Sequence, residues 1–289
     1  MSKNSDSEQK EVLIRKNLAE VFNDTKSHLE VAKIICDHLV NFQDIRSIAL
    51  EKVDFANVRS ILDLGCGFGY FTRGLKNKVH PDAKITGIDC HSKYKELYLN
   101  ALSETGIQGN FSSEGISFIN TIKTNSVDLI LCSYALYFFP EYIEQISRIL
   151  KKNGTFVVIT HTQPHMKEFT QYVKDILYNE GFDCREPLPY ESLIEGFSNE
   201  NGEALLSTRF TDIYNINYKG QLLFDYKDIE SFRTYFKFKR SFFIPCKETD
   251  IDDMSAIILS RMNTDLKRFK KFEISKNDII FVCEGSRNN

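Results

Sequence analysis

The sequence lacks features that would each indicate a different class of protein. Its seven cysteines are odd in number and widely scattered, with no C-x-x-C pair and no cysteine–histidine spacing that would bind zinc. We therefore expect reduced thiols, no metal site and a cytoplasmic location. No apolar run approaches the length that spans a bilayer, and residues 1–10 are polar and charged. These absences predict a soluble protein with no membrane partner.

An excess of positive charge is also lacking. The formal net charge is −3 and the isoelectric point is about 6.1, so the chain has no basic field of the kind that attracts nucleic-acid phosphates. Nucleic acid is therefore an unfavoured partner. A local basic and aromatic stretch at residues 235–240 could stack bases, but a solvated helix face explains the same residues better. The length of 289 residues suits one large α/β domain with insertions, or a domain with a cap.

A run of alternating glycines organises the rest of the chain. Residues 61–64 are apolar, as in a buried parallel strand, and glycine then stands at 65, 67 and 69 before an amphipathic segment begins at Tyr70. This pattern predicts a strand, a tight turn and a helix. Because glycine lets the backbone bend and leaves main chain bare near helix amides, the turn is predicted to cradle a small molecule.

Glycine spacing and two acids indicate which molecule. The third glycine comes one residue too early for the dinucleotide pattern G-x-G-x-x-G. Asp63, inside the strand, would repel a phosphate and attract an ammonium group. Asp89 ends a second apolar stretch about twenty residues after the turn, where a carboxylate can bind both hydroxyls of a ribose. The site suits a nucleoside with a cationic tail.

Residues 58–162 resemble class I S-adenosylmethionine-dependent methyltransferases of the small-molecule type. The segments that carry the resemblance are Asp63 with the glycines at 65–69, Asp89, and residues 111–116, 127–133 and 150–158. The resemblance implies an α/β fold with a doubly wound, mostly parallel seven-stranded sheet and an antiparallel C-terminal strand pair. It also implies three parts: an N-terminal helical cap (1–45), a cofactor-binding core (46–180), and insertion helices with the last two strands (181–289).

Hydrophobic periodicity places the individual elements. Helices are predicted between the core strands, at 8–22 and 29–39 before them, and in several places after them. The later segments are helices near 70–78, 92–105, 140–152, 164–180, 227–236 and 251–269, a strand at 210–218 that 221–224 could continue, and a last strand at 278–283. The first two helices and the insertion are where acceptor recognition, and a lid over the site, are expected.

The resemblance further implies a cofactor site for S-adenosyl-L-methionine. Asp63 is assigned to the ammonium group, with the alternative that it holds the turn by accepting backbone N–H bonds, and Asp89 to the ribose hydroxyls. The other predicted cofactor contacts flank these two acids: Gly65, Cys66, Gly67, Gly69, Cys90, Glu114, Gly115, Ile116, Ser133 and Tyr134.

A general base is harder to place. Many relatives have a histidine shortly after the fourth strand, but Phe138 stands at that place here. His161 and His165, in the loop that leaves the fifth strand, are the nearest candidates, although capping or solvated roles stay open for both. Tyr137 is a weaker candidate because an unperturbed phenol titrates near pH ~10.

The predicted function is methyl transfer to an O, N or C nucleophile of a small molecule, leaving S-adenosyl-L-homocysteine. Residues 133–136 lack the prolines of the adenine N6 and cytosine N4 enzymes, and the Pro245-Cys246 pair lies far from the position used by cytosine C5 enzymes. A tRNA or protein methyltransferase remains an alternative, as does a protein that binds the cofactor without catalysis.

Overall fold

The computed structural model describes residues 14–41, 43–182, 186–245 and 251–287. The chain forms two compact units, each built from three separate stretches. The first unit comprises residues 1–41, 163–196 and 219–277, and the second comprises 42–162, 197–218 and 278–289. The sequence analysis drew its boundaries after residues 45 and 180, so it placed 163–180 with the central range, whereas these residues pack in the first unit.

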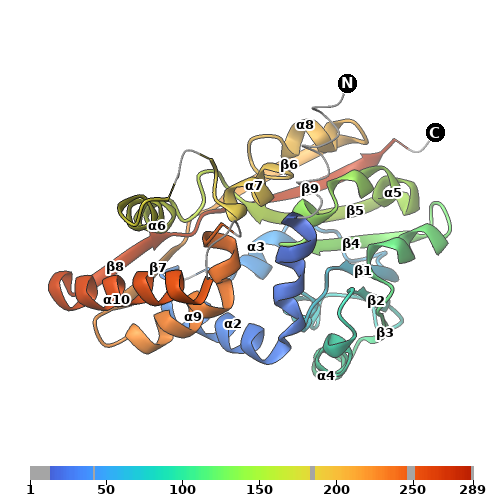
Figure 1. The fold of residues 1–289 in the computed structure, drawn as a ribbon. Helices are drawn as coiled ribbons and strands as arrows, with labels where there is room; N and C mark the ends of the chain where they lie inside the picture. The colour runs from blue at the N-terminus through green and yellow to red at the C-terminus, as the bar shows by residue number, and fades with distance from the viewer. Residues whose placement is uncertain (1–13, 42, 183–185, 246–250, 288–289) are drawn as a thin grey trace. The chain divides into compact units, whose positions relative to one another are not determined.

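A seven-stranded sheet forms the second unit (Figure 1). Its strands run in the order β3-β2-β1-β4-β5-β9-β6. Their bounds are β1 (Ser60–Leu64), β2 (Lys84–Ile88), β3 (Gln108–Ser112), β4 (Val127–Ser133), β5 (Leu150–His161), β6 (Phe210–Tyr218) and β9 (Asp278–Ser286). The first five strands are parallel, and β9 is antiparallel to both β5 and β6. The predicted α/β fold with its mostly parallel sheet and C-terminal antiparallel pairing is confirmed.

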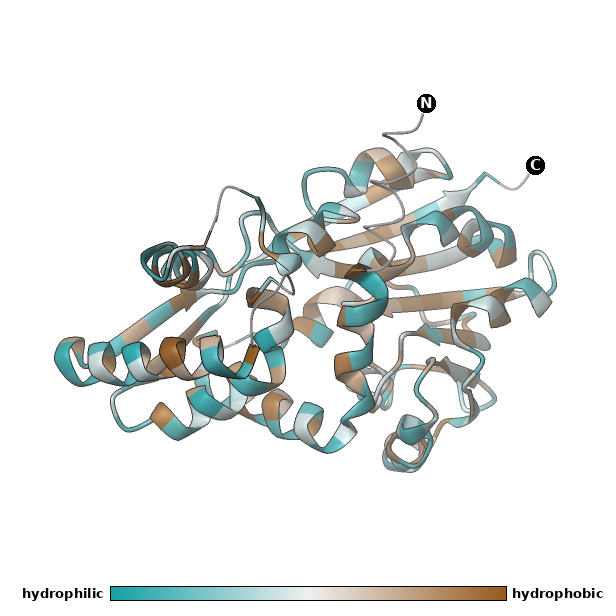
Figure 2. Ribbon diagram, viewed as in Figure 1, coloured by the Kyte–Doolittle hydropathy of each residue, from teal (hydrophilic) through white to brown (hydrophobic). Residues whose placement is uncertain are grey.

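The sheet forms because its central strands are apolar on both faces. Ile130 and Leu131 of β4 face opposite sides of the sheet and are 0% and 1% exposed. β4 is almost continuously hydrophobic (Figure 2), as expected for a parallel strand covered on both sides. The helices of this unit are α3 (Ile45–Leu50), α4 (Lys95–Thr105), α5 (Ile143–Ile149) and α8 (Gly202–Ser207). The sheet reverses its winding between β1 and β4, and ligands of such sheets bind at the carboxyl ends of the strands beside that point.

The segment after the glycine turn differs from the prediction. A helix was expected at 70–78, but only a short 3₁₀ helix forms, at Thr72–Leu75. Gly74 lies within it, and a Cβ atom there would stand 3.1 Å from the Cβ of Arg46 in α3. Glycine weakens a helix interior, and the tight approach to α3 favours glycine at this position.

The first unit has a separate aromatic core. Its elements are a helical stretch at 14–19, a 3₁₀ helix at Glu20–Asn23, α2 (Thr25–His38), α6 (Lys167–Asn179), α7 (Pro189–Glu195), α9 (Ile229–Phe243), α10 (Ile251–Phe269), β7 (Gln221–Asp225) and β8 (Lys271–Ser275). The fully buried side chains Phe169, Phe232, Phe236 and Phe243 pack on one another. Residues 8–13 of the first predicted helix lie outside the described residues. No helix in the described ranges is long and apolar enough to cross a membrane.

Two predictions in this unit were wrong. Residues 221–224 do not continue the strand at 210–218 but form β7, which pairs antiparallel with β8 in a two-stranded sheet. The sequence analysis did not predict β8. The pairing is set by burial, because Leu222, Phe224 and Ile274 are each 0% exposed on the shared inner face. The helix predicted at 227–236 continues to Phe243 for the same reason, since its later phenylalanines are buried as well.

Candidate active site

The three glycines of the turn have different structural roles. All have positive φ, +67° at Gly65, +48° at Gly67 and +76° at Gly69. A Cβ atom on Gly65 would stand 2.4 Å from the Cβ of Ala135, and one on Gly69 would stand 2.6 Å from the Cβ of Ala101. A Cβ atom on Gly67 would meet nothing within 4 Å. Two glycines therefore serve packing, and Gly67 leaves bare main chain with open space beside it, as a bound ligand requires.

Asp89 lies against this open part of the turn. Its Oδ2 atom accepts a hydrogen bond from the Gly67 amide (2.9 Å), and its Oδ1 atom accepts one from the His91 amide (3.0 Å). Burial raises the pKa of Asp89, and the two amides oppose that rise. Each carboxylate oxygen can accept more than one hydrogen bond. The carboxylate is thus held in one orientation at the end of β2 and can still accept bonds from two hydroxyl donors.

Asp63 holds the segment after the turn. It is 2% exposed, and it accepts a hydrogen bond of 2.6 Å from the Thr72 hydroxyl. The amides of Gly65 and Cys66 donate instead to the Ile88 carbonyl. Burial raises the pKa of Asp63 to about 7, against the lowering effect of Thr72 and with a smaller raising effect from the Asp89 charge. The sequence analysis missed Thr72, whose only signal was a hydroxyl residue at the start of the next helical segment.

The loops after β2 and β3 lie next to each other. Gly115 has a φ of +67°, and a Cβ atom there would be 3.3 Å from the Cβ of Cys90. Cys90 and Glu114 are exposed and Ile116 is half-buried. This arrangement puts the predicted adenine-flanking residues on one rim. Asp89, Cys90 and His91 also bring three atoms of metal-binding types within 4.8 Å of one another, although both carboxylate oxygens already accept bonds from backbone amides.

The ends of β4, β5 and β9 bring together a histidine, a carboxylate and two phenols. His161 ends β5 and Asp278 begins β9, and the two are partners in the strand register. The His161 Nδ1 atom lies 2.7 Å from Asp278 Oδ1, and the Tyr134 hydroxyl donates to Asp278 Oδ2 at 2.8 Å. The His161 ring stacks on those of Tyr134 and Tyr137, at 5.0 and 5.7 Å between centroids. The structure therefore assembles a polar cluster around His161.

The remaining predicted residues have separate environments. Ser133 is half-buried at the end of β4. Burial, aided by the Asp278 charge, raises the pKa of Tyr137 further above its usual value, so this phenol is a donor and not a base at neutral pH. His165 belongs to the first unit, where its Nδ1 atom donates to the Asn277 carbonyl at 3.0 Å and its ring meets the Tyr190 ring edge-on.

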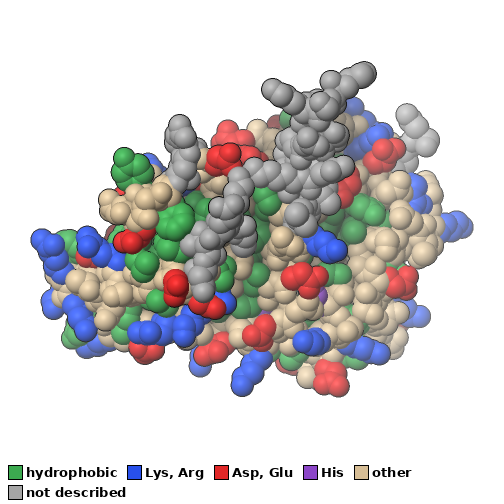
Figure 3. All heavy atoms as spheres, in the orientation of Figure 1, with side chains coloured by type: hydrophobic (Ala, Val, Ile, Leu, Met, Phe, Trp, Pro, Cys, Tyr) green, Lys and Arg blue, Asp and Glu red, His purple; other side chains and the backbone are tan. Residues whose placement is uncertain are grey.

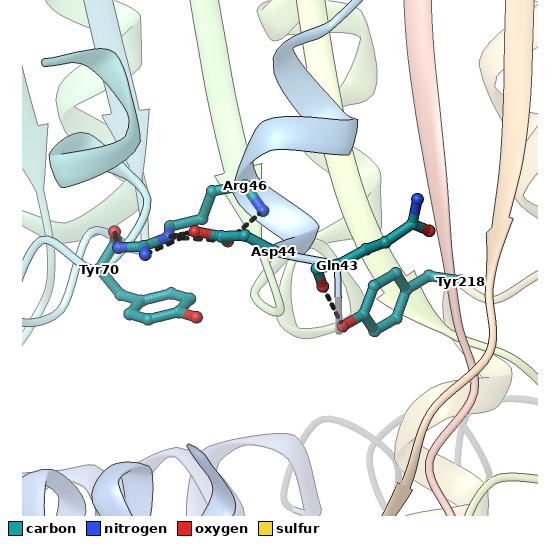
Figure 4. Close-up of polar contacts among 5 residues, drawn as sticks. All are labelled: Gln43, Asp44, Arg46, Tyr70 and Tyr218. Atoms are coloured by element: carbon teal, nitrogen blue, oxygen red, sulfur yellow. Dashed lines mark hydrogen bonds and ion pairs between the residues drawn. The ribbon is translucent and has the colours of Figure 1, made fainter. Parts of the chain in front are cut away.

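A second polar network fastens α3 beside the turn (Figure 4). Asp44 caps α3 by accepting from the Arg46 amide (2.9 Å), and it also pairs with the Arg46 guanidinium (2.7 Å). The guanidinium stands over the Tyr70 ring, 4.5 Å from its centroid. The Tyr218 hydroxyl donates to the Gln43 carbonyl (2.8 Å), which ties the same segment to β6. Burial disfavours ionised Asp44, but its bonds with Arg46 outweigh this and lower its pKa.

The basic and aromatic stretch in α9 has its aromatic residues inside. Tyr235, Phe236 and Phe238 are buried, so they are not surfaces on which bases stack. Lysine and arginine side chains gather over α9 and α10 (Figure 3). Three of them, Arg233, Lys237 and Arg240, line a groove of about 410 Å³ against α10. Lys237 is exposed, Lys239 and Arg240 are half-buried, and the aromatic part of the pattern serves the core.

The comparisons with known proteins agree with this geometry. Residues 57–195 match the family model described as a methyltransferase domain. This part of the chain is similar to a methyltransferase domain. The chain is 27% identical over 139 residues to demethylmenaquinone methyltransferase of Lactococcus lactis, covering 46% of this chain and 55% of that protein. It is 27% identical over 119 residues to the Staphylococcus aureus enzyme of the same name, covering 38% and 46%. The chain thus spans about half the length of these relatives.

Solved structures show the same fold. The YcgJ protein of Bacillus subtilis matches with a TM-score of 0.53 at 16% identity, over 84% of this chain and 98% of that one. The phosphoethanolamine N-methyltransferase 2 of Haemonchus contortus matches with a TM-score of 0.52 at 13% identity, over 94% and 60%. S-adenosylmethionine is the methyl donor of this family, and the open Gly67 backbone with the fixed Asp89 carboxylate fits such a group. The family resemblance found in the sequence is confirmed.

Proposed function

We propose that this protein transfers the methyl group of S-adenosylmethionine to a nucleophile of a small-molecule acceptor. The observation that carries the proposal is the Gly67 and Asp89 pair at the strand ends beside the β1 and β4 switch point. Gly67 would let the donor lie against the turn, and Asp89 would accept the ribose hydroxyls. The donor supplies an electrophilic methyl group on a sulfonium, and the protein contributes placement and exclusion of water.

A small acceptor is favoured over a nucleic acid. The net charge is −3, and the aromatic side chains of the basic stretch are buried. The relatives from Lactococcus lactis and Staphylococcus aureus are named for methylation of demethylmenaquinone. Reduced demethylmenaquinone is therefore the first acceptor to test, followed by smaller phenols and amines.

Titration calorimetry tests the cofactor part of the proposal. S-adenosylmethionine and S-adenosylhomocysteine should bind in the micromolar range and NAD should not. Asp89→Ala should weaken binding by about 1.5–3 kcal/mol because it removes charged hydrogen bonds, which is roughly 10- to 150-fold in Kd. Asp89→Asn keeps an acceptor for the Gly67 amide and should lose less.

The matched control is Asp82→Ala, which removes an exposed carboxylate from the loop before β2. Its affinity for S-adenosylhomocysteine should equal that of the wild type. Tight NAD binding, or an Asp89→Ala protein that binds S-adenosylhomocysteine normally, would contradict the assignment.

Release of S-adenosylhomocysteine in the presence of candidate acceptors tests catalysis. Turnover of RNA with a steep salt dependence would favour the macromolecular alternative. Tight cofactor binding with no product from reduced demethylmenaquinone, phenols, amines, RNA or protein would favour a binding protein without catalysis.

A further inference from the structure

We propose that His161 is a general base held in one tautomer by Asp278 and Tyr134, and that the acceptor therefore carries a proton on its nucleophilic atom. The inference rests on the proposed function and adds the acceptor class and two positioning residues to it. The sequence analysis singled out His161 and Tyr134 separately, and Asp278 not at all.

The hydrogen bonds fix the tautomer of His161. Asp278 is 1% exposed and His161 is 6% exposed. The Nδ1 atom of His161 lies 2.7 Å from the Oδ1 atom of Asp278. An ionised carboxylate only accepts hydrogen bonds, so the hydrogen must lie on Nδ1 of His161. In the neutral ring the lone pair then lies on Nε2, the nitrogen suited to take a proton.

Tyr134 completes the cluster at a conformational cost. Its φ is +57°, a left-handed conformation that is a strained outlier for a bulky residue. The conformation is held by the bond from its amide to the Ile159 carbonyl (2.9 Å), by the stacked His161 ring and by the bond to Asp278. Burial, with the Asp278 charge, keeps the pKa of Tyr134 well above its usual value. Tyr134 is therefore a constant donor to Asp278.

This arrangement suits an acceptor with an O–H group or a similarly acidic proton. The acceptor atom forms a bond to the methyl carbon while the carbon–sulfur bond breaks, and that electron pair stays on sulfur. The acceptor proton passes to Nε2 of His161. The resulting imidazolium is stabilised by the Asp278 carboxylate, whose other oxygen keeps the Tyr134 bond. An acceptor that is already anionic would need no such base.

Nuclear magnetic resonance of the protein labelled with ¹⁵N in its six histidines tests the tautomer directly. His161→Ala identifies the His161 signals. The wild type should show hydrogen on Nδ1. In Asp278→Asn the Tyr134 hydroxyl should donate to the amide oxygen, which turns the amide NH2 group toward His161. That group would donate to Nδ1, so the ring hydrogen of His161 should move to Nε2. Tyr134→Phe should keep the wild-type tautomer. An Nε2–H tautomer in the wild type, or an unchanged tautomer in Asp278→Asn, would overturn the proposal.

Kinetics on a phenol or other O–H acceptor identified by S-adenosylhomocysteine release test the role in turnover. Asp278→Asn should lower kcat about 10²- to 10⁴-fold, and Tyr134→Phe by less than about tenfold, the value of one hydrogen bond. The groups against His161 in the described part of this unit include Asp278, Tyr134 and Tyr137. The acidic limb of the pH–rate profile should vanish in His161→Ala and shift to lower pH in Asp278→Asn, where the imidazolium has lost its counter-ion.

Tyr172→Phe is the matched control. It removes a half-buried tyrosine hydroxyl that donates to a different aspartate, Asp265 (2.8 Å), within the first unit, and it should change neither tautomer nor pH profile. Wild-type turnover and an intact acidic limb in His161→Ala would overturn the proposal. Failure of the proposed function looks different: S-adenosylhomocysteine would not bind to the wild type, whatever the tautomer of His161.

Discussion

Replacing Gly65 by alanine should destabilise the second unit without touching the exposed part of the turn. The φ of +67° costs alanine about 1–2 kcal/mol. The new Cβ atom would also stand 2.4 Å from the Cβ of Ala135, far inside the normal carbon–carbon contact of about 3.5–4.0 Å. Relieving that overlap in a packed core costs about 1–3 kcal/mol. The free energy of unfolding should therefore fall by about 2–5 kcal/mol.

Comparison with Gly67→Ala separates the cost of the positive φ from the cost of the steric overlap with Ala135. Its φ is +48°, but a Cβ atom there meets nothing within 4 Å, so only the backbone cost of about 1–2 kcal/mol applies. For S-adenosylhomocysteine affinity we expect the opposite order, with Gly67→Ala losing more than Gly65→Ala. Gly67→Ala should lose more S-adenosylhomocysteine affinity than its stability loss explains, because the methyl group takes the space proposed for the ligand.

Urea unfolding followed by circular dichroism measures the stabilities, since the chain has no tryptophan. Hydrogen exchange of β1 and β4 amides assigns the loss to the second unit. Ala135→Gly in the Gly65→Ala background removes the clashing atom, so the two changes should couple favourably by about 1–3 kcal/mol. Equal destabilisation by Gly65→Ala and Gly67→Ala, or no coupling with Ala135→Gly, would refute the reasoning.

Two further predictions concern pH. The pKa of Asp63 is about 7 in the folded protein against an ordinary value of 3.8. The stabilisation from its protonated form is therefore complete below the unfolded pKa and is lost as the pH rises to about 7. In urea titrations from pH 4 to 8 the free energy of unfolding of the wild type should show this fall, and that of Asp63→Asn should not. Asp44→Ala should cost about 0.5–2 kcal/mol by removing the α3 cap. Because the pKa of Asp44 is lowered in the folded state, that cost should shrink in urea titrations as pH falls through the carboxylate range, and a constant cost would contradict the role of its charge.

The sequence by itself determined the features that depend on neighbours along the chain. The glycines at 65, 67 and 69 define a turn because their backbone angles are a local property. The apolar runs of β1, β2, β4 and β5 predict buried parallel strands, and α10 was predicted with its observed bounds because its apolar stripe is regular. Asp89 could be placed at the end of β2 for the same reason, although its role in binding stays a prediction.

The tertiary structure alone decided which distant residues meet. Asp278 is 117 residues from His161 and 144 from Tyr134, and no local pattern encodes such a pairing, which follows from the antiparallel register of β5 and β9. The β7 and β8 pair escaped prediction because short strands gain their stability from a shared buried face, which is a property of packing. The bond between Thr72 and Asp63 joins residues on the two sides of the glycine turn, and only the folded backbone shows that they meet. Local backbone preference thus fixed the turn and the strands, and burial between segments far apart in the chain fixed the polar cluster.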